Sequence, residues 1–425
     1  MLGLGVKIKA GALQFAILIS VVIAVIISAF ILLTYMQLQF AKQLERSSNT
    51  IKLSHMGIAY AKQQPLIYGD SIEIPIENEL KEELTVIRTH WGIFDKVLAL
   101  AKSKNFTSQK IGILGGQLSK EDRPAIYLED TNSPLVVVGE TTIYGNVTLP
   151  RQGIKPGNIV GNYYQGEKLV YGTITQNASI KPQLSEEKKS YINDLLFGSL
   201  PQQDSLFIGS YTTKISSSFT GAPKWIYSPD VIHIDNQSIE NNIIIKSDSL
   251  IRISAFAKAK NVILVAPHII IEDNATGSFQ AFASKSIRVG ENTKLSYPSV
   301  LLLQEKKKSL LTSKKEIIEG ITLDKESTIQ GSVIHLGSSE RNDSRSMITI
   351  SETATIEGEI YSDQIVQVSG IVKGSIFTHQ FATKTRGSVY KNHLFNAVID
   401  TRKLSESFCG LITTETQTNL VQWVY

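Results

Sequence analysis

Cysteine is almost absent from this sequence: Cys409 is the single one among 425 residues. That excludes an intrachain disulfide framework and any zinc or iron–sulfur site built from a cysteine cluster. A strong excess of one charge is also missing, since 43 basic and 39 acidic residues leave a net charge of +4. This excess is too small to indicate a nucleic-acid partner. The 42% of hydrophobic residues excludes wholesale disorder.

Motifs that carry chemistry are missing as well. The histidines have no metal-ligating spacing, and there is no nucleophile elbow. Residues 111–116 form a glycine-rich stretch, but it lacks the lysine that a phosphate loop requires. We therefore predict no catalytic, cofactor-binding or metal-binding residue, no cofactor and no enzyme. The seven histidines, expected to be surface or strand residues, are His55, His90, His233, His268, His335, His379 and His393.

One catalytic alternative stays open, because parallel β-helices include carbohydrate-active enzymes that gather polar side chains on one solvent face. Asp230, Asp235, Asp273 and Arg252 could meet on such a face, although no spacing singles them out. Cys409 lies between Phe408 and Gly410 in a mostly apolar tail. We expect its thiol to be buried and not catalytic.

A long hydrophobic run occupies the N-terminal region. No charged residue occurs from Ala10 to Ala41, and 15–33 is almost unbroken in apolar residues. Nineteen helical residues span roughly 28 Å, the thickness of a bilayer core. Bulky residues follow the run where a signal-peptide cleavage site would need small ones. The sequence predicts one retained transmembrane helix over 13–36, and the basic head before it favours a cytoplasmic N-terminus. We expect a single-pass protein of the bacterial inner membrane with a periplasmic C-terminal domain.

The stretch 9–15, Lys-Ala-Gly-Ala-Leu-Gln-Phe, resembles the start of type IV pilin-like and minor pseudopilin subunits. The resemblance covers about 30 residues and implies peptidase cleavage after Gly11. The acidic residue usual at the fifth place after the cut is replaced by Ala16. An ordinary signal anchor with a short basic head is the alternative.

Beyond the membrane we expect a helical stalk that loosens at 47–50 and ends at Gln63-Gln64-Pro65. The alternation in 71–76 predicts a strand. Apolar residues at three- and four-residue steps over 78–104 predict an amphipathic helix, which Gly92 weakens. Ser185 to Leu200 is also predicted to be helical.

Repeated short strands dominate the remaining sequence. An apolar triplet followed by Ile-x-Gly-x-Val or a close variant occurs at 135–147, 321–333, 348–360 and 366–376, with a fainter copy at 386–389. Similar β-rich runs without the glycine fill 241–303. An isolated copy cannot bury enough apolar surface, whereas stacked copies build a continuous core. We predict a right-handed parallel β-helix with coils of about 20 residues. Ile356 and Ile360 should point inward, Glu357 and Glu359 outward, and Gly358 should lie at a bend. A β-sandwich is the alternative.

The run 348–360, continued through Gly374, resembles the repeats of bactofilins, the bacterial polymer-forming cytoskeletal proteins. The resemblance covers about 321–390 and, less strongly, 134–148. It implies a β-solenoid core, in this chain interrupted by about 90 residues from 148 to 240. Two insertions, 306–315 with its five lysines and 338–346, are predicted to be solvated loops.

The predicted fold is therefore mainly β: one transmembrane helix, then a β-solenoid with a helical subdomain. The favoured function is a non-catalytic, membrane-anchored structural or interaction protein, with a minor pilin-like subunit as the alternative and a carbohydrate-active enzyme as the third. Expected partners are the bilayer, through 13–36, and a cell-envelope polymer or second copy, through the solenoid. The predicted domains are a head (1–12), the transmembrane helix (13–36), a helical stalk with the amphipathic helix (37–110), a first solenoid-like segment (111–180), an inserted mixed subdomain (181–228), the main solenoid (229–398) and a tail (399–425).

Overall fold

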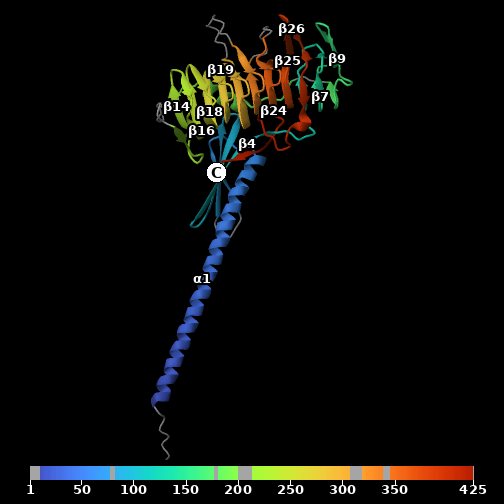
Figure 1. The fold of residues 1–425 in the computed structure, drawn as a ribbon. Helices are drawn as coiled ribbons and strands as arrows, with labels where there is room; N and C mark the ends of the chain where they lie inside the picture. The colour runs from blue at the N-terminus through green and yellow to red at the C-terminus, as the bar shows by residue number, and fades with distance from the viewer. Residues whose placement is uncertain are drawn as a thin grey trace, which may run out of the picture. The chain divides into compact units, whose positions relative to one another are not determined.

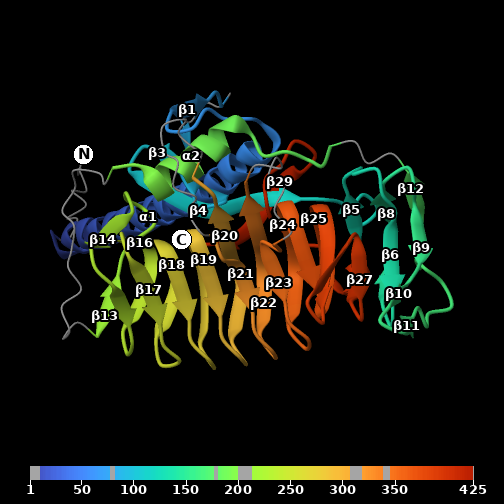
Figure 2. The same ribbon diagram turned by 90° about the horizontal axis from the view of Figure 1, so that it is seen from above.

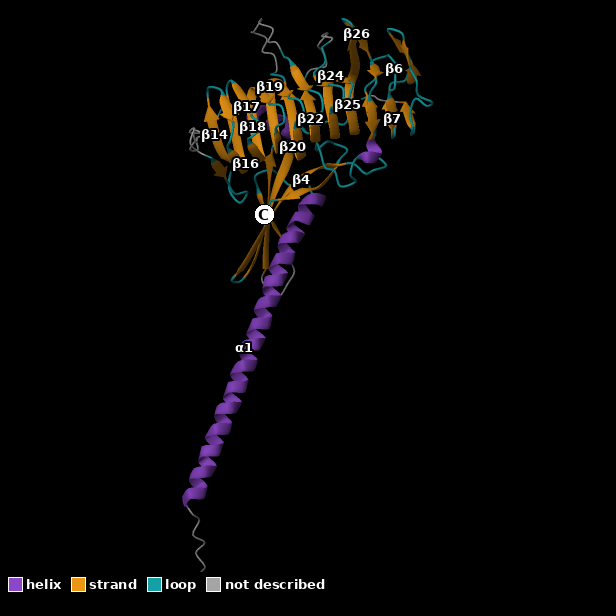
Figure 3. Ribbon diagram, viewed as in Figure 1, coloured by secondary structure: helices purple, strands orange, loops and turns teal. Residues whose placement is uncertain are grey.

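The computed structural model describes residues 10–76, 82–176, 180–199, 213–306, 318–337 and 345–424. Strands predominate, as the fold class predicts (Figure 3). The chain divides into two compact units. Unit 1 comprises Met1–Ala59, Ser71–Val86 and Ala99–Lys110; unit 2 comprises Tyr60–Asp70, Ile87–Leu98 and Ile111–Tyr425.

The long helix α1, Ala10–Gln63, contains the predicted membrane span (Figure 1). It is long and apolar enough to cross a membrane, and its most apolar stretch has a mean hydropathy of 3.2 with no residue buried. The hydroxyls of Ser20 and Ser28 donate to the carbonyls of Ala16 and Ala24, so neither serine leaves a polar group unpaired. This exposure is what a lipid-facing helix requires.

The expected loosening of the stalk at 47–50 is wrong. α1 continues without a break to Gln63, and the Thr50 hydroxyl donates to the carbonyl of Arg46 in the preceding turn. Because such a bond satisfies the hydroxyl group within the helix, a short polar side chain does not have to end it. The predicted end before Pro65 is confirmed.

The predicted amphipathic helix over 78–104 is wrong too. The structure has a hairpin there, made of β2 (Glu82–Trp91) and β3 (Phe94–Ser103) and followed by β4 (Phe106–Gln117). Residues 77–81 lie outside the described part of the chain. Leu84 and Val86 are buried with a residue between them that is not, which is the two-residue period of a strand. Gly92, in the turn, has a φ of +63°, which a helix does not allow.

In unit 1, the C-terminal part of α1 packs on these strands. Leu53 and Ile58 are buried, and the hydroxyls of Ser54 and Ser108 lie 3.1 Å apart. A Cβ added at Gly57 would lie 2.7 Å from the Cβ of Ala99, so glycine is what lets helix and strand approach here. The predicted strand at 71–76 is confirmed as β1, Ser71–Ile74.

The main part of unit 2 is a parallel, solenoid-like sheet whose strands stack side by side (Figure 2). Many register partners of adjacent coils lie 16 to 20 residues apart: Ile356 pairs with Val372, Ile251 with Ile269, and Ile239 with Ala259. Its strands over 213–400 are β13 (Lys214–Ser216), β14 (Lys224–Ser228), β15 (Ile232–Ile234), β16 (Ser238–Ser247), β17 (Leu250–Ile253), β18 (Lys258–Ile271), β19 (Thr276–Val289), β20 (Lys294–Gln304), β21 (Gly320–Leu323), β22 (Thr328–Leu336), β23 (Ile348–Ile350), β24 (Thr355–Val368), β25 (Ile371–Thr385) and β28 (Val398–Asp400).

Stacked apolar columns form the core of this sheet. One column consists of consecutive register partners, all at most 1% exposed: Leu295, Ile329, Ile356, Val372, Ile399 and Ile143. The repeat glycines form a second column in which Gly331 pairs with Gly358 and Gly358 with Gly374. A Cβ on Gly358 would overlap the carbonyl oxygen of Gly331. The inward positions of Ile356 and Ile360 and the close approach at the glycine are therefore confirmed.

The coils do not stack in chain order. The strands after β4 pack on the C-terminal coil, since β5 pairs with β25, β7 with β28, and β6 with β27. The first and last coils of the solenoid are therefore neighbours. Ile174–Gln176 pairs with Val147–Leu149 beside them, whereas Lys214–Ser216 pairs with Ser238–Glu240 of β16. The strands of this first segment and their partner are β5 (Ile126–Leu128), β6 (Leu135–Val138), β7 (Thr142–Tyr144), β8 (Val147–Leu149), β9 (Ile154–Pro156), β10 (Asn158–Ile159), β11 (Asn162–Tyr163), β12 (Ile174–Gln176) and β27 (His393–Phe395).

Two further expectations are corrected here. The faint fifth repeat at 386–389 is not a coil but the turn of an antiparallel hairpin between β25 and β26 (Ser388–Lys391). Arg386 and Gly387 both have positive φ, which suits a tight hairpin turn. The helical subdomain is not shown: within its described residues, 181–228 holds one helix, α2 (Glu186–Phe197), as predicted after Ser185. The last strand, β29 (Gln417–Trp423), pairs antiparallel with β4, and the short helix η1 is Thr401–Lys403.

Candidate functional site: a buried ionic network around Asp95

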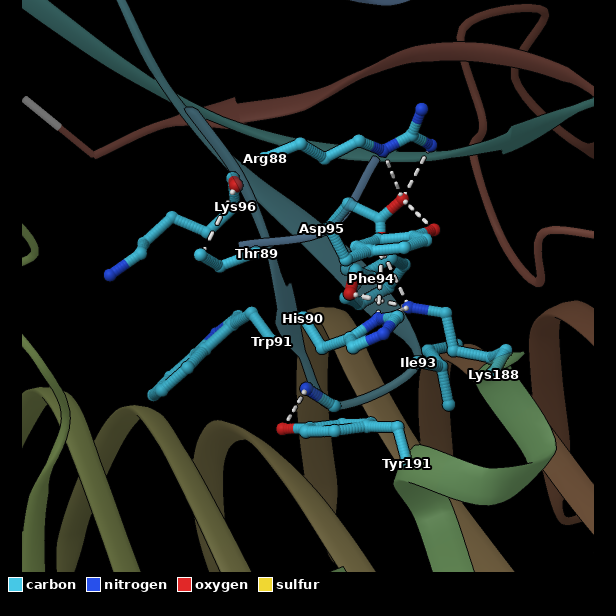
Figure 4. A network of polar contacts seen from close by, with 12 residues as sticks. Arg88, Thr89, His90, Trp91, Ile93, Phe94, Asp95, Lys96, Lys188 and Tyr191 are labelled. Atoms are coloured by element: carbon cyan, nitrogen blue, oxygen red, sulfur yellow. Dashed lines mark hydrogen bonds and ion pairs between the residues drawn. The ribbon is translucent and has the colours of Figure 1, made fainter. Parts of the chain in front are cut away.

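The most concentrated polar chemistry in unit 2 surrounds the carboxylate of Asp95, whose side chain is 0% exposed (Figure 4). Its Oδ2 accepts hydrogen bonds from Arg88 Nε at 2.8 Å and from the hydroxyl of Tyr68 at 3.0 Å. Its Oδ1 accepts from Lys188 Nζ at 2.6 Å. Both oxygens of the carboxylate are thus occupied by donors.

Several segments of unit 2 supply these groups. Tyr68 comes from the connection after α1, Arg88 from β2, Asp95 from β3 and Lys188 from the first turn of α2. The side chain of Ser185 caps α2 by accepting from the backbone N–H of Lys188, which fixes the helix start beside the carboxylate.

Aromatic rings enclose the charges. The His90 ring is stacked on Tyr68, with ring centres 3.8 Å apart, and on Tyr191, with centres 4.5 Å apart. Lys188 Nζ also contacts His90 Nδ1 at 3.0 Å and the carbonyl of Phe94 at 3.0 Å. An ammonium group can only donate, so His90 Nδ1 is the acceptor in this contact.

The electrostatics match this geometry. Burial would raise the pKa of Asp95, but the charges of Lys188 and Arg88 hold it well below its usual range. Burial lowers the pKa of Lys188, and its bond to Asp95 opposes that shift. Burial and the neighbouring Asp95 carboxylate raise the pKa of Tyr68, and burial raises that of Tyr191 to about 12. The carboxylate stays ionised and both phenols stay neutral at physiological pH.

The turn of the hairpin is fixed to the solenoid beside this network. Gln280 of β19 accepts from the N–H of Ile93 at 3.0 Å and donates to the carbonyl of Trp91 at 3.0 Å. The hydroxyl of Tyr191 accepts weakly from the N–H of Gly92 at 3.4 Å. Apolar side chains of β2, β3, α2 and the outer solenoid face form one buried cluster around these bonds.

This arrangement suits a structural lock. The carboxylate is fully buried and bonded by two cations and a phenol, so its charge is paired inside the fold and not presented to solvent. The cost of removing it from water is offset by Arg88 on the adjacent strand and by Tyr68 and Lys188 from other segments. The network therefore joins the hairpin turn, the connection after α1 and α2 into one piece of unit 2.

A second ionic cluster lies elsewhere on the solenoid. Glu129, after β5, bonds His379 Nδ1 at 2.8 Å and Lys181 Nζ at 3.2 Å, and Lys181 also pairs with Asp363 at 2.9 Å. Burial raises the pKa of Glu129, but His379 and Lys181 lower it further, to about 2. This cluster holds the segment before α2 on the solenoid surface.

The acids weighed for a carbohydrate-active site do not come together in the described part of the chain. Arg252 pairs with Glu272 at 3.2 Å, while Asp273 accepts from the backbone N–H of Glu291. The backbone N–H groups of Asp230 and Asp235 donate to the side chains of Ser228 and Gln237 in their own turns. Over the same described residues, no three His, Cys, Asp or Glu side chains could hold a metal ion.

The other residues singled out from the sequence have structural positions. Gly115 and Gly116 lie in β4, where a Cβ on Gly116 would overlap the carbonyl oxygen of Leu411; this crowding accounts for that glycine. Cys409 is buried, as predicted, and burial raises the pKa of its thiol to about 11. His335 is fully buried beside Glu305 and belongs to strand β22, which agrees with the expected surface or strand position.

The basic insertion falls outside the described residues over 307–317, and the second insertion over 338–344. Their predicted character as solvated loops stays a prediction.

Sequence reasoning missed both ionic clusters. Tyr68, Arg88, Asp95 and Lys188 are spread over 120 residues, so no local spacing links them. One signal was present in the sequence. Arg88 and Asp95 lie on the two strands of one hairpin, so a prediction of that hairpin would have suggested that they pair.

Comparisons with known proteins give little further guidance. No protein-family profile matches the chain, and no curated protein matches it. A solved structure that it resembles is the competence-associated pilin ComZ from Thermus thermophilus, at 8% sequence identity and a TM-score of 0.27. The match covers 89% of this chain and 97% of that chain. At this TM-score the likeness carries no argument about function, and the bactofilin resemblance stays a prediction.

Proposed function

We propose that this protein is a minor pilin-like subunit that inserts through α1 into a filament assembled from the bacterial inner membrane. It carries a non-catalytic β-solenoid on the periplasmic or outer side. The observation that carries the proposal is α1 itself, one uninterrupted helix from Ala10 to Gln63 that is lipid-compatible at one end and packed on antiparallel strands at the other.

The length of α1 exceeds what a simple anchor needs. A bilayer core requires about 20 helical residues, whereas this helix has 54. Beyond the predicted span, Leu44, Ile51 and Met56 remain 65%, 46% and 57% exposed. In a filament these side chains would pack against the α1 helices of neighbouring subunits.

The C-terminal part of α1 packs against strands β2 and β3. Leu53 and Ile58 are buried and Gly57 lies against Leu84, Val86 and Ala99. A flexible tether would show no such packing. This junction is suited to hold a folded domain at a fixed place on a helix that enters an assembly.

The partners in this proposal are the bilayer, through 13–36, and the α1 helices of other subunits. A cell-envelope polymer or a second copy is the proposed partner of the solenoid, and nucleic acid is not.

The test is processing at Gly11. The full chain is expressed with a prepilin peptidase and with a catalytically inactive form of it, and the N-terminus is determined by mass spectrometry. We expect a mature chain that begins at Ala12 only with the active peptidase. Gly11→Val should abolish the cut, and the control Gly5→Val should leave it. An intact N-terminus with active peptidase would show that the chain is a plain membrane anchor.

A further inference from the structure

A small cavity lies in unit 2 between the solenoid face and the C-terminal segment. About 10 Å³ of it is open to a water-sized sphere, close to the least that holds one water molecule. Arg123, Glu359 and Ser375 provide its charged and hydroxyl groups, with Thr416 beside them. The remaining lining residues are Gly116, Leu118, Phe377, Leu404 and Phe408.

The two polar solenoid residues that line the cavity, Glu359 and Ser375, are neighbours on successive coils. Glu359 pairs in register with Ser332 on one side and with Ser375 on the other. The Ser332 hydroxyl donates to Glu359 Oε1 at 2.8 Å, and the backbone N–H of Leu411 donates to the same oxygen at 2.5 Å. The expectation that Glu359 points to solvent is therefore wrong, because residues 409–411 cover it.

The hydroxyl of Ser375 is buried without a partner. The residue is 2% exposed, and within the described chain its Oγ makes no hydrogen bond. A buried hydroxyl without a hydrogen bond destabilises the folded state. Because Ser375 lines a cavity with room for about one water molecule, a water there could bond this hydroxyl.

The guanidinium of Arg123 contributes spare donors. The residue is 5% exposed and gives one bond to the carbonyl of Ser405 and one to that of Leu118. Since a guanidinium has five N–H groups, others are available to the cavity. Its positive charge makes the cavity unsuitable for a metal cation.

We propose that this cavity is a binding site for one water molecule, which bridges the Ser375 hydroxyl and the Glu359 carboxylate within reach of Arg123. A water needs two to four polar partners, and these three groups meet that requirement. Burial raises the pKa of Glu359, in keeping with a carboxyl group shut off from bulk solvent. The site would fasten residues 404–416 to the solenoid, and it is independent of the proposed filament function.

The test is a crystal structure of the full chain in detergent at a resolution that shows ordered water. We expect one density peak within hydrogen-bonding distance of both Ser375 Oγ and the Glu359 carboxylate. An empty cavity, or a Ser375 hydroxyl bonded directly to Glu359, would overturn the proposal.

Two variants check the role of Ser375. Ser375→Ala should weaken or remove the density and lower the Tm by about 2–4 °C. The control Ser388→Ala, at an exposed position on β26, should change neither. A water peak and a Tm unchanged in Ser375→Ala would show that the hydroxyl is not a partner of the water.

Discussion

At the scale of single residues, Lys188 bears most directly on the stability of unit 2. Its side chain is 1% exposed, and its ammonium group donates to Asp95 Oδ1 at 2.6 Å. Lys188→Met keeps the length of the side chain but leaves part of a buried carboxylate unpaired. We expect the free energy of unfolding to fall by about 3–5 kcal/mol, measured by denaturation of the full chain in detergent.

The neighbouring lysine is the matched control. Lys189 lies in the same helix with a 37% exposed side chain and pairs with Glu186 one turn away. Exposed pairs contribute little, so Lys189→Met should change the free energy of unfolding by less than about 1 kcal/mol. Equal losses in both variants would mean that the Asp95 network does not stabilise the fold.

The lowered pKa of Glu129 predicts that the stability of the fold decreases at acid pH. Its pKa of about 2 lies below its ordinary value, so the folded state favours the ionised form. The stability from this group is complete above its unfolded pKa and is lost as pH falls through the folded one. Between about pH 4.5 and 2, Glu129→Gln should therefore lose less stability than the wild type, although it is less stable at pH 7.

Melting temperatures measured across that pH range check the Glu129 prediction. Glu121→Gln, on an exposed turn, should keep the wild-type slope. Parallel curves for wild type and Glu129→Gln would contradict the role assigned to the pair with His379 and Lys181.

The residue scale is where sequence reasoning was weakest. Burial of Ile356 follows from its place in a repeat, because a repeat specifies its own neighbours. The partners of Asp95 do not, since Lys188 belongs to a helix that reaches the hairpin only through the tertiary fold. Glu359 shows the same limit: its strand position faces outward, but a distant segment covers it.

At the scale of elements, the coil 355–376 allows a graded test. Ile356→Ala should cost about 2–4 kcal/mol, because its side chain fills a column shared with Ile329 and Val372. Gly358→Val should be at least as severe, since its Cβ would overlap a backbone oxygen of the adjacent coil. Glu357→Gln should cost less than about 1 kcal/mol, because its pair with Lys373 is part-exposed.

Thermal melts of the three variants in the full chain rank their losses of stability. Equal tolerance at 356 and 357 would show that the run is not a stacked coil.

Helices and strands could be predicted where the pattern of apolar residues fits one type of secondary structure. The apolar run of α1 and the repeated strands of the solenoid are of this kind. The 82–103 hairpin was misread because its alternating strands are rich in apolar residues on both faces. Leu84, Ile87 and Trp91 then fit helical spacing by coincidence, while the burial of Leu84 and Val86 reveals the two-residue period.

At the scale of the whole molecule, the sequence predicts that coils are present but not the order in which they stack. The repeat at 135–147 lies next to the C-terminal coil and not next to the following repeat in the sequence. Parallel coils of similar composition can pair with any neighbour of the right register. The contacts that fix the order, such as Ile143 on Ile399, become evident only from the fold.

The proposed place of α1 in a filament can be tested directly by shearing surface filaments from bacteria that express the full chain. The filament and membrane fractions are then probed for the protein. We expect the wild type in the filament fraction and Gly11→Val confined to the membrane fraction. Filaments that contain other pilins but never this chain, with the wild type wholly in the membrane, would contradict the account.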